Sequence, residues 1–237
     1  MKKIIGILGG MGPEATAYFY GLLIKHTRAA KDQDHIPVLI WSDPRVPDRT
    51  AALLRGGPSP LPRLAAGARG LRRAGANFLV IPCLTAHYYL DELRKVCPIP
   101  VVSLLEETER FLKRSRPRLR CVGLLASSGT IRSGLFQKAM AKAGVQVLAP
   151  SESGQKKVME AIYGRQGIKA GFTSGKSKTL LRRAAAHLIR RGGQAILAGC
   201  TEVPLALKPE ELPAPILDPM DITARSCVLR AGFKLRG

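Results

Sequence analysis

An apolar run that ends in glycines decides the fold: Ile4-Ile5-Gly6-Ile7-Leu8-Gly9-Gly10-Met11-Gly12-Pro13-Glu14. Ile4–Leu8 predicts a strand, because its successive residues are apolar, as in a parallel strand buried on both faces. Pro13–Ala30 predicts the helix that follows, because proline and glutamate are both favourable in a first helical turn. A strand, a glycine-rich loop and a helix form the unit from which α/β proteins are built.

The same alternation continues along the chain. Further strands are predicted at Val38–Trp41, Phe78–Ile81, Val101–Val102, Cys121–Ala126, Val145–Leu148, Ala195–Ala198 and Pro215–Leu217. Further helices are predicted at Pro60–Arg73, Ala86–Lys95, Leu104–Lys113, Thr130–Lys142, Gln155–Tyr163, Lys178–Arg191 and Pro219–Arg230. This repetition predicts an α/β fold in which mainly parallel sheets are flanked by helices.

An internal repeat divides the pattern into two halves. Gly6 and Gly123 stand in predicted strands, Cys83 and Cys200 follow predicted strands, and the members of both pairs are 117 residues apart. The period is far too long for a solenoid, so it indicates a duplicated domain. We expect two pseudo-symmetric α/β domains, one of residues 1–104 with 213–237 and one of residues 105–212. The last helix is expected to pack on the first domain.

Length and composition fit a folded globular protein. The chain has 237 residues, of which 46% are hydrophobic and 23% charged, and this excludes a mainly disordered chain. Five cysteines without zinc-type spacing argue against a disulfide framework or a metal site and favour a reducing cytoplasm. The apolar amino terminus is too short for a secretory signal, and no run is long and apolar enough for a membrane span.

The two repeated cysteines carry the chemistry. Ligands of parallel α/β sheets bind beyond the carboxyl ends of the strands, where Cys83 and Cys200 are expected. The positive end of the following helix favours a thiolate. A thiolate and a thiol on opposite faces of one carbon form a two-base device that inverts a carbon acid. Either cysteine alone fits a buried apolar residue equally well, and the other three are predicted to be structural, namely Cys97, Cys121 and Cys227.

Eight motifs occur in order along nearly the whole chain: Ile5–Thr16, Asp34–Pro37, Pro47–Thr50, Pro82–His87, Gly123–Thr130, Lys157–Tyr163, Gly167–Gly171 and Gly199–Pro204. On these motifs the chain resembles the cofactor-independent aspartate/glutamate racemase family, and its aspartate racemase branch in particular. The resemblance implies an active site between the two domains, with Cys83 and Cys200 as the acid/base residues that interconvert L- and D-aspartate. It also implies an enzyme without pyridoxal phosphate, metal or nucleotide, and a homodimer.

The resemblance also points to residues that would hold the substrate. Arg49 and Lys169 match positions that family members use to bind substrate carboxylates, a role that suits a guanidinium well. In so basic a chain, both also fit ordinary surface cations. Hydroxyl groups that follow the strands can bind the α-carboxylate and the developing negative charge, or simply cap helices: Thr85, Ser127, Ser128 and Thr201.

Three further residues stand close to these motifs. Met11, in the first glycine-rich loop, lines the pocket or packs in the core. His87, one helical turn after Cys83, tunes that thiol or caps and packs locally. Glu202, two residues after Cys200, orients the thiol, binds an amino group, or is a solvated carboxylate at a helix start.

One position departs from the family. Leu84 follows the first cysteine directly, where relatives carry asparagine. An asparagine side chain can hydrogen-bond the substrate, whereas leucine cannot. Glutamate, or a broader set of amino acids, is therefore the alternative substrate.

The charge suggests a non-enzymatic alternative. Lys and Arg number 38 against 17 Asp and Glu, a net charge of +21, and Arg110–Arg120 holds six cations without an acid. Such charge favours polyanions through counterion release, but no nucleic-acid recognition motif accompanies it. Gly10–Ala15 also matches a dinucleotide fingerprint loosely, and Asp43 comes late for the acidic residue that this fingerprint needs.

Overall fold

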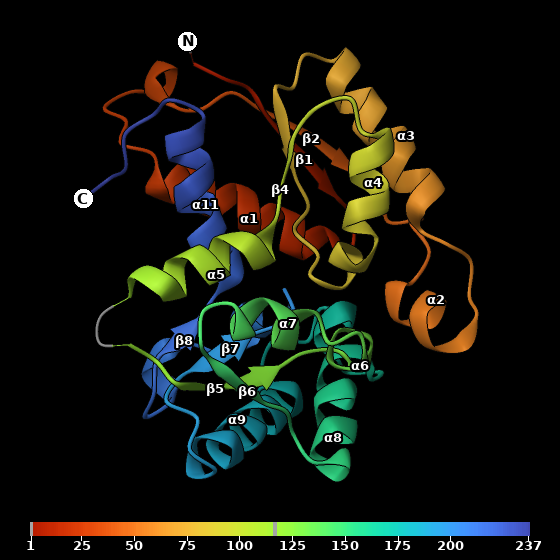
Figure 1. The fold of residues 1–237 in the computed structure, drawn as a ribbon, viewed down its shortest axis with the longest axis vertical. Coiled ribbons are helices and arrows are strands. Elements are labelled where there is room, and N and C mark those ends of the chain that lie inside the picture. The colour runs from red at the N-terminus through yellow and green to blue at the C-terminus, as the bar shows by residue number, and fades with distance from the viewer. Residues whose placement is uncertain (1, 116–117) are drawn as a thin grey trace. The chain divides into compact units, whose positions relative to one another are not determined.

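The computed structural model describes residues 2–115 and 118–237, so two positions of the basic run Arg110–Arg120 lie outside the described residues. The chain divides into two compact units (Figure 1). Unit 1 runs to Glu107 and resumes at Met220–Gly237, and unit 2 is Thr108–Pro219.

Unit 1 contains a four-stranded parallel sheet in the order β2-β1-β3-β4. Its strands are β1 (Ile5–Gly9), β2 (Val38–Ser42), β3 (Phe78–Val80) and β4 (Val101–Val102). Its helices are α1 (Pro13–His26), α2 (Arg49–Arg55), α3 (Leu61–Arg73), α4 (Leu90–Val96), α11 (Pro219–Arg230) and the 3-10 turns η1 (Asp32–Asp34) and η2 (Thr85–Tyr89). Helices α1 and α11 lie on one face of the sheet, and α3 and α4 on the other (Figure 1).

Unit 2 repeats this plan with a parallel sheet in the order β6-β5-β7-β8. Its strands are β5 (Cys121–Leu125), β6 (Gln146–Leu148), β7 (Ile196–Ala198) and β8 (Ile216–Leu217). Its helices are α6 (Ser128–Arg132), α7 (Leu135–Ala141), α8 (Glu152–Tyr163), α9 (Gly175–Arg190), α10 (Val203–Ala206) and the 3-10 turns η3 (Ile168–Ala170) and η4 (Pro209–Glu211). Helix α5 (Leu104–Arg114) spans the division between the units.

The predicted α/β fold with two parallel sheets flanked by helices is confirmed, and strand register preserves the internal repeat. Gly6 pairs with Leu79 between β1 and β3, and Gly123 pairs with Ile196 between β5 and β7. Each residue again lies 117 positions from its counterpart. Both glycines are closely packed: a Cβ on Gly6 would stand 2.5 Å from the end of the Leu79 side chain, and one on Gly123 would stand 2.7 Å from Cβ of Leu188.

The central strands of both sheets are almost completely buried. All five residues of β1 and all three of β3 and β7 are buried, as the continuous apolar runs predicted. Leucines fill the core between the unit 1 sheet and α3 and α4, while leucine, isoleucine and valine side chains of α8 and α9 fill that of unit 2. Burial of each such side chain contributes about 1.5–3 kcal/mol.

Helix boundaries differ from the sequence predictions in several places. Helix α1 ends at His26 instead of Ala30, because Thr27 adopts an extended conformation and pairs with Leu235. The predicted helix Thr130–Lys142 is two helices, α6 and α7, which are separated at Gly134. Helix α2 was not predicted; the Asp48 carboxylate caps it by accepting from the Ala51 N–H at 2.7 Å.

The last helix closes unit 1. His26 Nε2 on α1 contacts an oxygen of Asp221 on α11 at 2.7 Å. The N–H of Lys3, before β1, donates to the carbonyl of Ala231 at 3.0 Å. The carboxyl-terminal segment thus binds both the residues before the first strand and the first helix.

The contact between the loop after β1 and the loop after β2 can be tested by substitution of a glycine. Gly10 has φ +91°, and a Cβ there would stand 2.4 Å from the backbone of Asp43. We expect Gly10→Ala to lower the free energy of unfolding by at least about 2 kcal/mol, measured by urea unfolding with circular dichroism. Gly21→Ala is the matched control, because nothing lies within 4 Å of a Cβ on this α1 residue. It should raise stability by about 0.5–1 kcal/mol, and equal shifts in both variants would contradict the packing.

Candidate active site

Parallel pairing brings five of the predicted site residues of unit 1 to one edge of its sheet. Strands β1, β2 and β3 run in the same direction, so the loops that follow them meet at the carboxyl edge. The loop after β1 carries Met11, the loop after β2 leads to Arg49, and the loop after β3 carries Cys83, Leu84 and Thr85.

Arg49 joins two of these loops. Its guanidinium donates to the carbonyl oxygens of Val46 at 3.3 Å, Pro47 at 3.1 Å and Met11 at 2.9 Å. The residue is only 7% exposed, so the interpretation as an ordinary surface cation is wrong. Arg49 therefore holds a fixed positive charge beside the glycine-rich loop.

Cys83 lies in a largely apolar environment. It is 4% exposed and belongs to the same core cluster as Met11, Val46 and Ala86. Leu84 is also buried, and the buried Thr85 begins η2. Met11 and Cys83 therefore belong to one cluster. Of the two roles predicted for Met11, packing in the core is the one that the structure shows.

His87 binds the backbone around Cys83. Its Nε2 accepts the N–H of Leu104 at 3.0 Å, so the ring proton lies on Nδ1, which donates to the carbonyl of Cys83 at 2.9 Å. Burial lowers the pKa of His87 to about 4. The ring is therefore neutral at pH 7 and holds the Cys83 loop to the start of α5. The predicted capping and packing role fits this geometry, because both ring nitrogens are occupied by backbone groups.

The serines predicted for the site lie at the carboxyl edge of the unit 2 sheet, after β5. Ser127 caps α6, because its hydroxyl oxygen accepts a hydrogen bond from the Thr130 N–H at 3.4 Å. The Ser128 hydroxyl accepts from Nε2 of Gln155 at 3.2 Å, and the same amide donates to the carbonyl of Ala126 at 3.0 Å. Ser127 therefore performs the predicted capping, and a glutamine of α8 fixes the loop.

Three predicted residues converge around the second cysteine. The Cys200 thiol donates to Oε2 of Glu202 at 2.8 Å, and the Thr201 hydroxyl donates to the same oxygen at 3.3 Å. The ammonium of Lys169, from η3, binds the other oxygen, Oε1. Glu202 has a side chain only 4% exposed, so it is not a solvated carboxylate. Of its predicted roles, contact with the thiol is the one that the structure contains.

Electrostatics make this thiol a weak acid. Burial raises the pKa of Cys200 well above its usual range, and the negative charge of Glu202 raises it further. The positive charge of Lys169 acts in the opposite direction. Cys200 is therefore protonated at neutral pH.

The remaining cysteines are all free thiols outside these loops. The Cys97 thiol donates to the carbonyl of Ile99 at 3.1 Å after α4, and Cys121 opens β5 at the amino edge of its sheet. Cys227 is buried in α11, and burial raises the pKa of its thiol. These placements fit the predicted structural roles.

Sequence reasoning missed the arginines that surround Asp43 at the end of β2. Oδ1 of Asp43 accepts from Nε and the backbone N–H of Arg45, both at 3.0 Å, and Oδ2 accepts from Arg63 at 2.7 Å. The hydrogen bond from the Arg45 side chain is the main cause that lowers the pKa of Asp43. Asp43 directly follows the second strand, which ends at Ser42, and both of its carboxylate oxygens are bound within the protein. Arg63 is 20 residues away on α3, and no local pattern identifies it as the partner.

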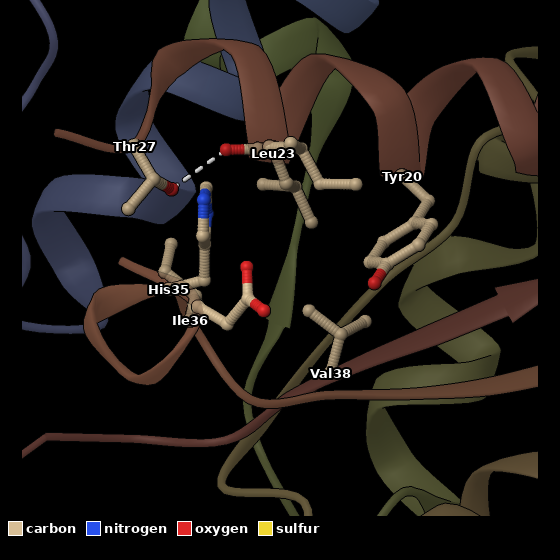
Figure 2. Close-up of a pocket in the computed structure, with 8 residues that line it drawn as sticks. Tyr20, Leu23, Thr27, His35, Ile36 and Val38 are labelled. Carbon is tan, nitrogen blue, oxygen red and sulfur yellow. Dashed lines mark hydrogen bonds between the residues drawn. The ribbon is translucent and has the colours of Figure 1, made fainter. Parts of the chain in front are cut away.

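A separate cavity lies in unit 1 between α1, η1 and the start of β2 (Figure 2). Its volume is about 330 Å³, and its walls include Tyr20, Leu23, Ile36 and Val38, with Asp32 and His35 as polar groups. None of the predicted site residues lines it. It adjoins the amino end of β2, whereas the predicted residues follow the carboxyl ends of the strands.

Among residues 2–115 and 118–237, no group of three or more His, Cys, Asp or Glu side chains is placed to hold a metal ion. No helix in this part of the chain combines the length and the apolar character needed to cross a membrane.

Known proteins resemble this chain in both sequence and architecture. A family profile described as Asp/Glu/Hydantoin racemase matches residues 8–227. The broad specificity amino-acid racemase RacX of Bacillus subtilis (strain 168) is 27% identical over 232 residues, covering 95% of this chain and 96% of that protein.

Solved structures agree with this match. The aspartate racemase of Picrophilus torridus has a TM-score of 0.85 and 29% identity, with 99% of this chain and 96% of that chain covered. A glutamate racemase from Francisella tularensis subsp. tularensis SCHU S4, in complex with D-glutamate, has a TM-score of 0.70 and 17% identity. The match covers 98% of this chain and 83% of that chain. At that identity the likeness shows the fold alone.

The buried imidazole beside Cys83 makes stability depend on pH. The folded protein holds His87 neutral to about pH 4, whereas an unfolded histidine takes up a proton near pH 6.5. Its contribution is therefore complete above pH 6.5 and is lost as pH falls towards 4, by about 3 kcal/mol. We expect His87→Ala to lower the free energy of unfolding most at pH 7. The difference in this free energy from wild type, measured by urea unfolding, should be smaller at pH 4. His187→Ala, at an exposed position of α9, is the control, and a pH-independent difference for His87→Ala would contradict the assignment.

Proposed function

The chain belongs to the Asp/Glu/hydantoin racemase family and is an amino-acid racemase, and we propose that it interconverts L- and D-aspartate with Cys83 and Cys200 as its acid/base residues. The observation that carries the proposal is the equivalent placement of the two thiols. Cys83 follows β3 and Cys200 follows β7, the strands that pair with β1 and β5 in the same register. A duplicated fold thus supplies one thiol from each unit, as a two-base reaction requires.

The proposed reaction moves two protons at one carbon. A thiolate removes the α-proton, so that the C–H bond breaks, an S–H bond forms and the electron pair remains on the substrate. The second thiol donates its proton to the opposite face, so that its S–H bond breaks and a new C–H bond forms. The configuration inverts, and the atoms and charges balance without a co-reactant. General acid–base catalysis by positioned side chains contributes about 10²–10⁴-fold per group.

The carbanion needs stabilisation at the substrate carboxylates. We assign Arg49 and Lys169 to these groups, with support from the hydroxyl and N–H donors at the two carboxyl edges. Three backbone carbonyls fix the guanidinium of Arg49, and a fixed donor costs no reorganisation during the reaction. An ammonium carries three N–H donors, so Lys169 can hold Glu202 and a substrate carboxylate together.

Aspartate is the proposed substrate, with a broader set of amino acids as the alternative. The Picrophilus torridus aspartate racemase supports the first, and the broad specificity racemase of Bacillus subtilis supports the second. Leu84 is the residue on which this choice is proposed to depend. It is buried beside Cys83, so it offers packing surface where an asparagine would offer hydrogen bonds.

Three other expectations stay predictions. The five free cysteines support a reducing, cytoplasmic compartment. The homodimer rests on the family resemblance. Polyanion binding rests on the net charge of +21 and is the alternative if no amino acid is turned over.

Exchange of the α-proton in D₂O, followed by NMR, tests the proposal. With reductant and no added cofactor, we expect L- and D-aspartate to lose their α-proton signal and their optical activity. Cys83→Ala and Cys200→Ala should each lower racemisation by at least about 10³-fold, while one-sided exchange can persist. Cys97→Ala should retain activity, because its thiol donates to the Ile99 carbonyl after α4, outside the loops that carry the predicted site residues. Racemisation by both catalytic variants would contradict the two-base mechanism, and no exchange with any amino acid would overturn the assignment to amino acids.

The role of Leu84 has its own test. We expect Leu84→Asn to raise kcat/KM for aspartate relative to neutral amino acids by about tenfold, since one hydrogen bond to a charged group is worth about 1.5–3 kcal/mol. Competition between aspartate and a neutral amino acid in one NMR sample measures the ratio directly. Leu84→Met preserves the apolar packing and should leave the ratio unchanged. A ratio that moves equally in both variants would show that packing, and not the hydrogen bond, decides preference.

A further inference from the structure

The two cysteines stand at equivalent places but have different neighbours. Thr85 lies two residues after Cys83, and Glu202 lies two residues after Cys200, so the repeat of 117 positions places a hydroxyl in one unit where the other has a carboxylate. The duplicated backbone would by itself make the thiols alike. The side chains make them chemically different.

Glu202 is built into the unit 2 site by three contacts. It accepts from the Cys200 thiol and the Thr201 hydroxyl on Oε2 and from Lys169 on Oε1. The thiol is 7% exposed and the Glu202 side chain is 4% exposed, so water competes little with these contacts. A carboxylate acceptor stabilises the S–H form, because a thiolate at the same position would face a negative charge.

Lys169 limits this effect. Its side chain is 24% exposed, and its ammonium binds the distal oxygen of Glu202 and lies 5.4 Å from the centre of the Tyr163 ring of α8. Glu202 and Lys169 supply the charges that act on Cys200, while α9 and α10 pack apolar side chains in the same core cluster, including Leu181 and Val203. The carboxylate and the ammonium therefore act on the thiol with opposite signs.

We infer that Glu202 holds Cys200 as the proton donor of the resting enzyme, so that Cys83 removes the first α-proton. This inference rests on the proposed function. The α-C–H bond breaks and an S–H bond forms on Cys83; the Cys200 S–H bond then breaks and its proton forms the new C–H bond. Cys200 is left as a thiolate, which Lys169 stabilises. Glu202 acts through Cys200, so it is a positioning residue and not a catalytic one.

Thiol reactivity tests the resting state without any turnover. Methyl methanethiosulfonate is applied at pH 8 to the full-length protein, and peptide mass spectrometry follows the Cys200 peptide. Each unit of pKa decrease raises the thiolate fraction about tenfold and lowers its intrinsic reactivity about threefold. We therefore expect Glu202→Gln to speed modification by about threefold or more and Lys169→Met to slow it. Glu152→Gln removes an exposed carboxylate paired with Lys156 and should change nothing.

The pH profile of kcat/KM supplies a second readout, which a purely structural role would not move. The donor thiol sets the alkaline limb of the profile. Glu202→Gln should therefore shift the alkaline limb to lower pH and leave the acidic limb in place. Glu202→Asp keeps the carboxylate, so its alkaline limb should lie close to that of the wild type. The inference is overturned if Cys200 reactivity is unchanged in Glu202→Gln, if Glu202→Gln and Lys169→Met move it in the same direction, or if only the acidic limb moves. Circular dichroism shows that each variant is folded. A wild-type protein that exchanges no amino acid would defeat the proposed function instead, and the thiol measurement would still decide how Glu202 acts on Cys200.

Discussion

The parallel pairing of β3 with β1 and of β7 with β5 is the constraint on which the rest of the structure depends. Parallel strands need a crossover helix between them and leave all their carboxyl ends at one edge. The backbone there must turn from a buried strand into a loop, so its polar groups need partners. Arg49 and His87 meet that need in unit 1, and Ser127 and Gln155 meet it in unit 2. The contacts that complete the fold therefore also fix loops at the carboxyl edges of the sheets, and His87 fixes the loop that carries Cys83.

Duplication of this plan makes symmetry the default, and the side chains beside each cysteine break it. Cys83 lies among apolar residues with a neutral histidine bound to its carbonyl, whereas Cys200 donates to a buried carboxylate. A reaction that removes a proton on one face and delivers one on the other needs two groups in different protonation states. Different neighbours at matched backbone positions can supply that difference without a change of fold.

The sequence was sufficient for features that depend on local pattern. Continuous apolar runs identified buried strands such as Ile5–Gly9, and a shared spacing identified the duplication. The helix Arg49–Arg55 escaped prediction because a single capping carboxylate, Asp48, initiates it in a short segment with a weak apolar pattern. Interactions between distant residues were also out of reach: Arg63 with Asp43, Gln155 with Ser128, and the ring nitrogens of His87 with two backbone groups. Each depends on tertiary packing, which no spacing in the chain encodes.

The charged cluster at Cys200 is hard to explain by stability alone. Desolvation of a buried carboxylate costs several kcal/mol, which attraction to a partner charge offsets only in part. Apolar replacements of buried ion pairs are often neutral or stabilising. Lys169 compensates Glu202 from a position about a quarter exposed, while the carboxylate itself is almost fully buried against the thiol. The Asp43 cluster differs, because both of its arginine partners are considerably exposed and it joins strand β2 to α3. Glu202 joins η3 to the loop after β7 through Lys169, and its other oxygen accepts from the Cys200 thiol. A buried carboxylate against a titratable thiol is not needed for that link, so its energetic cost is better explained by control of the proton on Cys200.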